Sequence, residues 1–490
     1  MFRPALTLFF LFSFVFLPDW SINSLVEVLA NGNSTTYGYI SRSSLEEKEQ
    51  VIEIQGIVDL KGEILEIPSN CLLKFNRGRI INGKVIGSRT RIERINNSAI
   101  FHNVSIGGTW NVTDVSSSFF LDKSYCLEQV FALTDPTVYN KVVIEKGKYY
   151  VSRSDLSEGA LNIKSNTDLI IKGEIIVTPN NYSHYYILNL KDVKNVTVSG
   201  GAIVGDRNEH IGNSGEWGHG IFVWGNSENI VIDGVRIRNC WGDGVAIGRS
   251  EAVKNVELAN LRIENCRRNG ISVIACDGCC IRNCSISNIE GTAPEYAVDI
   301  EPNKSGHVSD VLLSGLKIRG KSGILVPIAN ADDQHFIKKI RINNCDIRTI
   351  KRCVSIDGAD GVIIDGNKLI NKTEDESIPL VIDHDSKDII ITNNQVVKRL
   401  RNHNSDASVL FVNPEKVTIT SNLFRGEKCS LGYFVNGNHV IKNNTIKCSV
   451  GFIRIRNSKI ENNIYRGGKF IPNPDNGCVV TGNRVRSINY

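Results

Sequence analysis

Seven short segments decide the fold: VTVSG (196–200), IVIDG (230–234), VELAN (256–260), VLLSG (311–315), IRINN (340–344), VIIDG (362–366) and IIITN (389–393). Each one alternates aliphatic residues, mostly β-branched, with other residues, and each ends in glycine or asparagine. Such alternation is typical of a short strand with one buried face. Gly and Asn tolerate the left-handed backbone of a tight corner. The segments therefore predict one repeated unit, a short strand followed by a turn.

The spacing of the turns indicates the kind of repeat. Consecutive turns are 19 to 34 residues apart, and the predicted turn residues are Gly200, Gly234, Asn260, Cys284, Gly315, Asn344, Gly366, Asn393, Ser421, Asn443, Asn462 and Gly482. This variable period does not fit helical repeats of fixed length. It fits a parallel β-solenoid, whose coils stack about 4.8 Å apart and bury a continuous aliphatic column. Asparagines at one corner of successive coils are expected to form a side-chain amide ladder.

The chain divides into three predicted parts. Residues 1–22 are read as a signal peptide, residues 50–120 as a small β-rich module, and residues 123–490 as the solenoid. The solenoid would begin with a short helix through Leu127 and Val130, followed by the strand Val142–Ile144. Such a helix caps the first coil, because the open end of a solenoid is an exposed sheet edge.

Composition and the N-terminus suggest a class of protein. The 490 residues are 41% apolar and carry a net charge of +5, which argues against a dedicated polybasic nucleic-acid binder and leaves an anionic polysaccharide open. The apolar run 5–17 is short for a membrane span and lies at the extreme N-terminus, so we expect a cleaved signal peptide, with an uncleaved anchor as the alternative. We therefore expect a protein that is secreted, periplasmic or on the cell surface, with no membrane span after cleavage.

The 13 cysteines allow two interpretations. The group Cys276, Cys279, Cys280 and Cys284 suggests zinc, but its spacing is irregular and no second pair of ligands completes it. Several cysteines instead follow an asparagine, as in Asn239-Cys240 and Asn265-Cys266. At recurrent turn positions a small thiol stacks well in the core. We favour buried, stacked thiols, and we predict no metal apart from a possible calcium ion.

Several segments resemble a known family. The helix followed by VVIEKGKYYV (142–151) is similar to the start of right-handed parallel β-helices of the pectate lyase superfamily. The stretches 205–220, CWGDG (240–244), RRNG (267–270) and 291–303 resemble a branch of secreted bacterial and phage β-helix proteins, and residues 50–112 resemble a module common in Bacteroidota. The resemblance implies an all-β, right-handed, single-stranded parallel β-helix. It implies no single reaction, because this superfamily contains lyases, hydrolases, epimerases and inert spikes.

Aligning four coils by the strand after each corner places the candidate site. His219–Trp224 aligns with Asp243–Gly248, then with Asn269–Ile274, then with Tyr296–Glu301. Alternate residues of each strand point inward. The outward residues would form an open floor of small side chains, with Phe222 and Trp224 at one end and Asp299 and Glu301 at the other. A sugar chain laid across the coils could stack on the aromatic rings and reach the carboxylates.

Two sets of ionisable residues could carry chemistry. Asp299 and Glu301 share one face of a strand about 6.5–7 Å apart, which falls within the 6.5–9.5 Å or so of inverting glycosidases. Asp243 and His219 are expected about 5 Å apart on adjacent coils and could serve as acid and base. Solvated carboxylates, a cation-binding pair or a turn-capping Asp243 are the structural alternatives. The long insertion Asp206–Trp217 lies over the same place, which favours a function there.

Three hypotheses follow. The first is an enzyme, a glycoside hydrolase or polysaccharide lyase; the second is a glycan-binding or adhesive protein without catalysis; the third is a purely structural solenoid. For the enzyme, the candidate catalytic residues are Asp243, Asp299, Glu301, Glu216 and His219. The candidate substrate-binding residues are Asp206, Arg207, His210, Trp217, Trp224, Arg268 and Asn269. Arg207 and Arg268 would hold uronate carboxylates or pair with Asp206 and Asp243.

Two reactions of the superfamily can be compared with these residues. Polygalacturonases carry an aspartate, an aspartate pair and a histidine on successive coils; the equivalent coils here carry His219, Gly242-Asp243 and Asn269, so that chemistry is doubtful. A pectate lyase needs calcium-binding acids and a basic proton acceptor. Asp243, Asp299 and Glu301 beside Arg268 would resemble such a set. The sugar, its linkage and the oligomeric state are left open.

Overall fold

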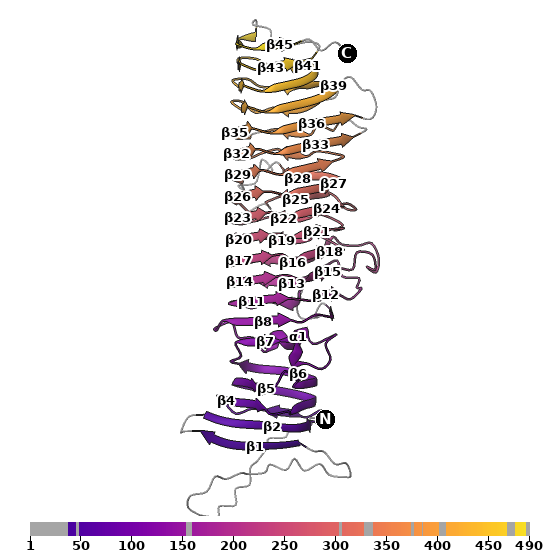
Figure 1. Cartoon of the computed structure of the whole chain (residues 1–490), viewed down its shortest axis with the longest axis vertical. Helices are drawn as coiled ribbons and strands as arrows, with labels where there is room; N and C mark the ends of the chain where they lie inside the picture. Colours follow the sequence, from indigo (N-terminus) through magenta and orange to yellow (C-terminus); the bar gives the residue numbers. More distant parts are fainter. Residues whose placement is uncertain are drawn as a thin grey trace, which may run out of the picture. The chain divides into compact units, whose positions relative to one another are not determined.

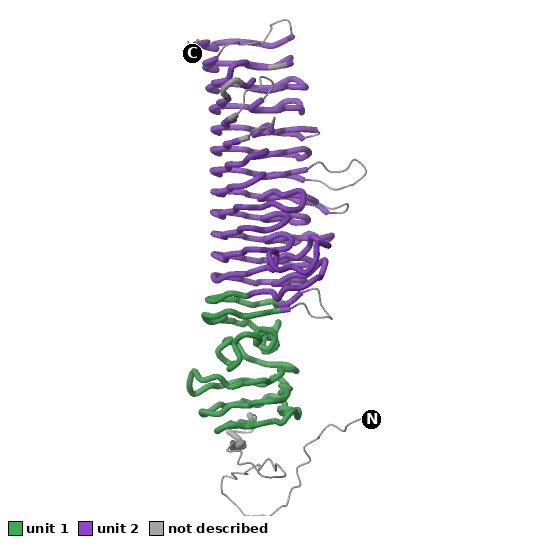
Figure 2. The backbone as a smooth tube through the Cα atoms, turned by 90° about the vertical axis from the view of Figure 1, so that its right-hand side faces the viewer, with its two compact units in different colours: residues 1–151, 163–175 green, residues 152–162, 176–490 purple. Residues whose placement is uncertain are grey.

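The computed structural model describes residues 38–45, 49–152, 159–302, 306–327, 337–373, 377–384, 386–400, 408–467 and 476–486. The predicted signal peptide lies outside the described residues. The chain forms two compact units, residues 1–151 with 163–175 and residues 152–162 with 176–490 (Figure 2). The domain boundaries drawn from the sequence stay a prediction, and residues 123–151 group with the first unit.

Unit 1 is built mainly from parallel strands. Strand β1 pairs antiparallel with β2, whereas β2, β4, β5 and β6 pair in parallel, as do β7 and β8. The predicted helix is α1, which contacts β6 and β9 and buries Leu127, Val130 and Phe131. The elements are β1 (Gly38–Leu45), β2 (Glu49–Asp59), β3 (Ile64–Glu66), β4 (Cys71–Phe75), β5 (Arg79–Arg94), β6 (Phe101–Trp110), β7 (Asp114–Ser116), η1 (Ser117–Phe119), α1 (Leu127–Ala132), β8 (Asn140–Ile144), β9 (Lys148–Val151) and β11 (Thr167–Ile171), and β12 (Glu174–Val177) crosses the boundary in sequence.

Unit 2 is a stack of coils with three parallel ladders, and most coils add one strand to each ladder (Figure 1). The first ladder carries the candidate site and contains β10 (Gly159–Asn162), β13 (His184–Lys191), β16 (Trp217–Trp224), β19 (Val245–Ile247), β22 (Ile271–Val273), β25 (Tyr296–Ile300), β28 (Ser322–Val326), β31 (Val354–Ile356), β34 (Leu380–Ile382) and β37 (Ser408–Val412).

The second ladder contains β14 (Lys194–Ser199), β17 (Glu228–Asp233), β20 (Val253–Ala259), β23 (Cys276–Arg282), β26 (Val308–Ser314), β29 (Ile337–Asn343), β32 (Asp360–Asp365), β35 (Lys387–Thr392), β38 (Thr418–Thr420), β40 (Val440–Lys442), β42 (Lys459–Glu461) and β44 (Val479–Thr481). All seven segments that predicted the repeat begin within strands of this ladder; VTVSG (196–200), for example, begins in β14, and IIITN (389–393) begins in β35.

The third ladder contains β15 (Ala202–Val204), β18 (Arg236–Arg238), β21 (Arg262–Glu264), β24 (Ser285–Ser287), β27 (Lys317–Gly320), β30 (Asp346–Thr349), β33 (Lys368–Thr373), β36 (Gln395–Leu400), β39 (Leu423–Phe434), β41 (Thr445–Ile453), β43 (Ile464–Arg466) and β45 (Arg484–Arg486). Strand β39 is long enough to pair with β37 of the first ladder as well.

The core of unit 2 consists of aliphatic columns. Along the first ladder, one column holds Ile221, Val245, Ile271, Val298, Ile324, Val354, Leu380 and Leu410, each 0% exposed. Full burial of one such side chain contributes roughly 1.5–3 kcal/mol. A column of this length explains why the coil register is well defined, since a slip of one residue would turn every aliphatic side chain outward.

The corners follow the predicted turn residues with one exception. Gly200, Gly234 and Asn344, for example, have φ of 71°, 65° and 53°. At the predicted turn residue Cys284, the left-handed position belongs instead to the preceding Asn283, with φ of 56°. This correction has a simple cause, since asparagine adopts that backbone more readily than cysteine.

The predicted asparagine ladder is present and buried in the later coils. Each member donates Nδ2–H to the Oδ1 of the next, over 2.9–3.0 Å; the members are Asn367, Asn394, Asn422, Asn444, Asn463 and Asn483. The ladder lies one position after the predicted turn residues of these coils, because the left-handed residue itself points outward. None of the 13 cysteines forms a disulfide in this structure, and all but Cys280 are buried.

Candidate functional site

Four neighbouring strands of the first ladder, β16, β19, β22 and β25, carry the candidate site. Their register aligns Phe222, Ala246, Ser272 and Asp299, as expected from the sequence. The expectation of an open floor is wrong, because Phe222 is 4% exposed and the other three residues are 0% exposed. Arg268 reaches over this column, with its Nη1 3.5 Å from the hydroxyl of Ser272. The site is therefore a buried polar cluster rather than a bare platform.

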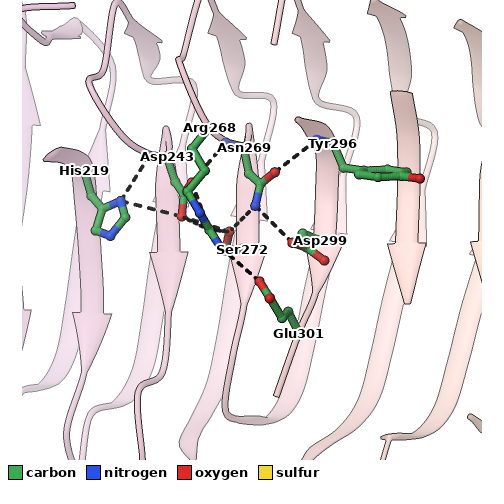
Figure 3. Close-up of polar contacts among 8 residues, drawn as sticks. All are labelled: His219, Asp243, Arg268, Asn269, Ser272, Tyr296, Asp299 and Glu301. Carbon is green, nitrogen blue, oxygen red and sulfur yellow. Dashed lines mark hydrogen bonds and ion pairs between the residues drawn. The ribbon is translucent and has the colours of Figure 1, made fainter. Parts of the chain in front are cut away.

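Arg268 lies at the centre of this cluster and joins two acids (Figure 3). Its Nη1 is 3.3 Å from Oδ2 of Asp243, and its Nη2 is 3.1 Å from Oε2 of Glu301. Burial acts to lower the pKa of Arg268, but the charges of Asp243 and Glu301 prevail and raise it. Arg268 therefore stays a cation. The ion-pair alternative describes it better than a free clamp for substrate.

Asn269 and Ser272 hold the two aspartates of the cluster by hydrogen bonds. Asn269 donates from Nδ2 to Asp299 Oδ2 at 3.0 Å and to Ser272 Oγ at 3.1 Å, and its Oδ1 accepts the backbone N–H of Tyr296 at 3.0 Å. Ser272 in turn donates to Oδ2 of Asp243 at 2.9 Å. Ser272 was not singled out from the sequence, although its position in the aligned column beside Asp299 was the available signal.

Asp299 has the most perturbed environment of the cluster. Burial raises its pKa well above the usual value, and the nearby Glu301 and Asp243 add to the rise. As a carboxylate, its Oδ1 has no hydrogen-bond partner. Glu301 is within hydrogen-bonding reach, so the protonated form of Asp299 gains a bond that the ionised form lacks. The separation of about 6.5–7 Å applies to the strand backbone, whereas the two carboxyl groups converge.

His219 is the neutral base of the cluster. Its Nδ1 accepts the backbone N–H of Asp243 at 3.0 Å and lies 3.6 Å from the Asp243 carboxylate. Burial lowers the pKa of His219 more than the Asp243 charge raises it. The ring stacks on Tyr186, with centroids 5.7 Å apart and planes 6° apart. Because Nδ1 is an acceptor, the ring proton is on Nε2.

The insertion 206–217 is anchored through Asp206. This side chain accepts hydrogen bonds from the hydroxyl of Tyr185 and from the backbone and side-chain nitrogens of Asn180 at 3.2 and 3.0 Å. Its Oδ2 is also 2.9 Å from Nδ1 of His210. Both side chains of this last pair are 0% exposed, so Asp206 and His210 fix the loop and do not face solvent.

A stack of rings and a guanidinium completes the anchor. His210 stacks on Trp241 with centroids 4.0 Å apart, and the guanidinium of Arg267 lies 3.8 Å from the centre of the Trp241 ring. Arg267 also donates to the carbonyl of Gly215 at 2.8 Å. The insertion is thus a fixed wall beside the cluster.

The remaining predicted residues occupy this wall or its neighbour. Glu216 is not brought to the acid cluster; its charge acts on Arg267, as does that of Arg207. Nη1 of Arg207 is buried and has no hydrogen-bond partner. Trp217 is 48% exposed and offers an accessible ring. Trp224 is more constrained, since its Nε1 donates to Asn189 at 2.8 Å and Lys191 lies 4.3 Å from its ring centre.

The calcium ion allowed by the sequence does not fit the acid cluster. Arg268 already supplies the positive charge between Asp243 and Glu301. Among the described residues, no three His, Cys, Asp or Glu side chains are grouped closely enough to hold a metal ion. Within the same residues, no helix is long and apolar enough to span a membrane.

Comparison with known proteins agrees with the ladders described above. Residues 219–446 match the family model described as the right-handed β-helix region. The chain is a right-handed parallel β-helix. The matched part of this β-helix includes the acid cluster and most of the asparagine ladder.

Two curated relatives, both from Bacillus subtilis (strain 168), match parts of the β-helix. The SPbeta prophage-derived uncharacterized protein YorA is 29% identical over 240 residues, which are 44% of this chain and 39% of the relative. The uncharacterized protein YclG is 31% identical over 196 residues, which are 35% of this chain and 33% of the relative. The chain thus spans well under half the length of either relative.

Solved structures share the fold of this β-helix at low sequence identity. The A-module of the mannuronan C-5 epimerase AlgE6 from Azotobacter vinelandii has a TM-score of 0.51 at 12% identity, over 74% of this chain and 94% of that one. The tailspike protein of E. coli bacteriophage HK620, in complex with a pentasaccharide, has a TM-score of 0.54 at 14% identity, over 74% and 75%. At these identities the likeness shows the fold alone.

Proposed function

We propose that this protein is a secreted carbohydrate-active β-helix protein, a glycoside hydrolase whose acid chemistry resides in Asp299 and Glu301. The observation that carries the proposal is the carboxyl pair itself. A fully buried aspartate with a raised pKa touches a glutamate whose side chain is 42% exposed. Pairs of carboxyl groups with separated pKa values are typical of sites that donate a proton at neutral pH.

The two acids would have different roles. Asp299 is 0% exposed and cannot meet a substrate directly, so it holds the proton that the pair shares. Glu301 faces solvent and would deliver that proton to the leaving glycosidic oxygen, as a general acid. Arg268 and Asp243 would keep the pair in place, because Arg268 contacts both Asp243 and Glu301.

Hydrolysis is favoured over β-elimination by the state of the bases. A lyase needs a group that accepts a proton from the sugar ring. Arg268 stays protonated, and Nδ1 of His219 is occupied by the backbone N–H of Asp243. Trp217, half-exposed on the wall, would stack on a sugar ring. The epimerase is named for mannuronan, and the tailspike is in complex with a pentasaccharide, which agrees with a polysaccharide as the ligand.

Glycan binding without catalysis is the second candidate. It is favoured by the burial of Asp243 and Asp299, each 0% exposed, which leaves Glu301 as the accessible carboxyl of the cluster. A catalytic pair normally has both groups within reach of the bond. The apolar run 5–17 supports export for either candidate.

The test is a screen of the purified protein against a panel of polysaccharides. New reducing ends report hydrolysis, and ultraviolet absorbance of new double bonds reports elimination. We expect reducing ends without absorbance, and a loss of at least about 100-fold in kcat for Glu301→Gln, the usual size of a general-acid contribution. Asp357→Asn is the matched control, because Asp357 is a half-buried acid two coils further along the same ladder.

The outcomes separate the two candidates. Cleavage that survives Glu301→Gln contradicts the assignment of the acid. If the protein binds a polysaccharide of the panel but cleaves none, and Glu301→Gln binds equally well, the glycan-binding candidate is supported instead.

A further inference from the structure

Two cysteines occupy equivalent positions on consecutive coils beneath the site. Cys240 and Cys266 each follow an asparagine with left-handed backbone, Asn239 and Asn265, with φ of 58° and 55°. Nδ2 of Asn265 donates to Oδ1 of Asn239 at 2.7 Å, and the backbone N–H of Arg267 donates to the carbonyl of Cys240 at 3.0 Å. These bonds place the two cysteines in register, one directly above the other.

The two thiols have equivalent surroundings on the two coils. Each thiol donates a hydrogen bond to the carbonyl two residues before it. The acceptor is the carbonyl of Arg238, at 3.9 Å, for Cys240 and that of Glu264, at 3.8 Å, for Cys266. The neighbouring thiol of Cys266 also raises the pKa of Cys240. Neighbouring strands lie about 4.8 Å apart, within the range of about 4.4–6.8 Å that Cα atoms span across a disulfide.

We infer that Cys240 and Cys266 are a coil-to-coil cross-linking pair that forms a disulfide when the chain folds in the presence of a disulfide oxidant. With oxidised glutathione the step balances: two protein thiols and one glutathione disulfide give one protein disulfide and two glutathione thiols. One thiolate attacks glutathione, and the second then displaces it from the mixed disulfide. This inference does not depend on the proposed function.

The cross-link forms during folding, once the two coils are in register and before the thiols are buried. In the folded chain both cysteines are 0% exposed, and the partner thiol and burial raise the pKa of Cys240 well above its usual value. Only the thiolate attacks a disulfide, so the folded pair is inert. The same burial protects a bond that has formed.

The consequence falls on the candidate site. Cys240 precedes the turn that presents Asp243, and Cys266 precedes Arg267 and Arg268. A bond between the two sulfur atoms would join the two corners that supply the central ion pair. Cys284 serves as an internal comparison, because its thiol contacts the carbonyls of Leu258 and Arg282.

Peptide mapping tests this inference directly. The full chain is unfolded in urea with reductant, refolded with oxidised glutathione, checked by circular dichroism, denatured, alkylated with N-ethylmaleimide and digested with trypsin. Cys240 and Cys266 lie on separate tryptic peptides, residues 239–249 and 263–267, with one cysteine each, and Cys284 lies on residues 283–304. We expect the first two peptides to be joined, two hydrogens lighter than their reduced sum, while Cys284 is alkylated.

Two results would overturn the inference. One is alkylation of both Cys240 and Cys266 in the refolded, oxidised chain. The other is a Cys240→Ser chain in which Cys266 is joined to another cysteine to the same extent as it is joined to Cys240 in the original chain, which would show non-specific oxidation. In that variant we expect Cys266 to be alkylated.

Discussion

Two stretches of the same β-helix bury polar side chains, and they differ in how completely those side chains are hydrogen-bonded. In the asparagine ladder every side-chain amide is satisfied; Asn394, for example, donates to the carbonyl of Ile364 at 2.7 Å and to Asn422 at 3.0 Å, and it accepts from Asn367. In the coils between residues 219 and 301, Oδ1 of Asp299 and Nε of Arg268 are buried without a hydrogen-bond partner. The same solenoid thus contains a complete and an incomplete polar network.

The difference indicates what each network does. A complete network of buried amides stabilises the stack, because each bond formed in a low-dielectric interior replaces a bond to water. An incomplete network costs stability, since each unsatisfied buried group carries a penalty of about 1–3 kcal/mol. A protein retains such a cost where it serves a function. The ladder is therefore a structural element, and the acid cluster is the candidate site.

The largest effect is expected from breaking the ladder in its middle. Asn422→Ala removes the acceptor for Asn394 and the donor to Asn444, and it leaves buried groups without partners. We expect the unfolding free energy of the later coils to fall by about 3–5 kcal/mol, measured by urea denaturation. The control is Asn483→Ala at the last rung, which is partly exposed and where Asn463 alone among the ladder residues loses a partner, so that the loss should be about 1 kcal/mol. Equal losses at the two positions would contradict the cooperative ladder.

The second effect concerns the centre of the acid cluster. Arg268→Met removes the positive charge from the buried Asp243 and from Glu301. We expect a loss of about 2–4 kcal/mol, because one partner of a buried ion pair is left uncompensated. Arg348→Met is the control, since Arg348 pairs with Asp346 near the surface and should cost less than about 1 kcal/mol. A cost for Arg268→Met as small as that of the control would show that the cluster is not electrostatically coupled.

The sequence was sufficient to predict the coil register and most of the corners. Period-two alternation and Gly or Asn at turns aligned Ile221 with Val245 and Ser272 with Asp299, because one register alone buries every aliphatic column. Burial at the site could not be predicted, since it depends on the direction in which long side chains leave a corner. Arg268 folds over Ser272, and that contact has no signature in spacing.

The insertion shows the same limit. The length of the insertion favoured a functional site nearby, and its polar residues suggested contacts to a substrate. Asp206 and His210 instead bind each other beneath Trp241. Which groups pair is decided by three-dimensional packing among residues far apart in the chain; Arg267, for example, donates to the carbonyl of Gly215, 52 positions away. Alternation and turn chemistry carry no information about such contacts.

The third effect is a gain in stability. The pKa of Asp299 is raised in the folded protein, so its contribution to stability is present below its ordinary pKa of 3.8 and is lost as the pH rises through the raised folded value. Asp299→Asn cannot ionise and keeps an acceptor for Asn269. We expect the variant to be about 1–2 kcal/mol more stable than the original chain at pH 7, and to lose this advantage near pH 4. If Asp299→Asn is less stable than the original chain at every pH, the claim that ionised Asp299 destabilises the fold is contradicted.

The smallest effect is an acid sensitivity caused by His219. Its pKa is lowered from 6.5 in the folded protein, so its contribution to stability is present above 6.5 and is lost as the pH falls through the folded value. We expect the original chain to lose about 1 kcal/mol more than His219→Gln between pH 6.5 and pH 5, in thermal denaturation followed over that range. Parallel profiles for the two chains would show that His219 does not titrate differently in the fold.

The central claim is that the β-helix raises the pKa of one carboxyl group, that of Asp299, well above its ordinary value. Carbon NMR of protein labelled at the aspartate carboxyl carbon measures it directly, with Asp299→Asn identifying the signal. The account predicts that Asp299 titrates well above 3.8, whereas Asp346, whose pKa is lowered by Arg348 and Arg319 despite its partial burial, titrates below 3.8. A midpoint for Asp299 at or below 3.8 would contradict the account.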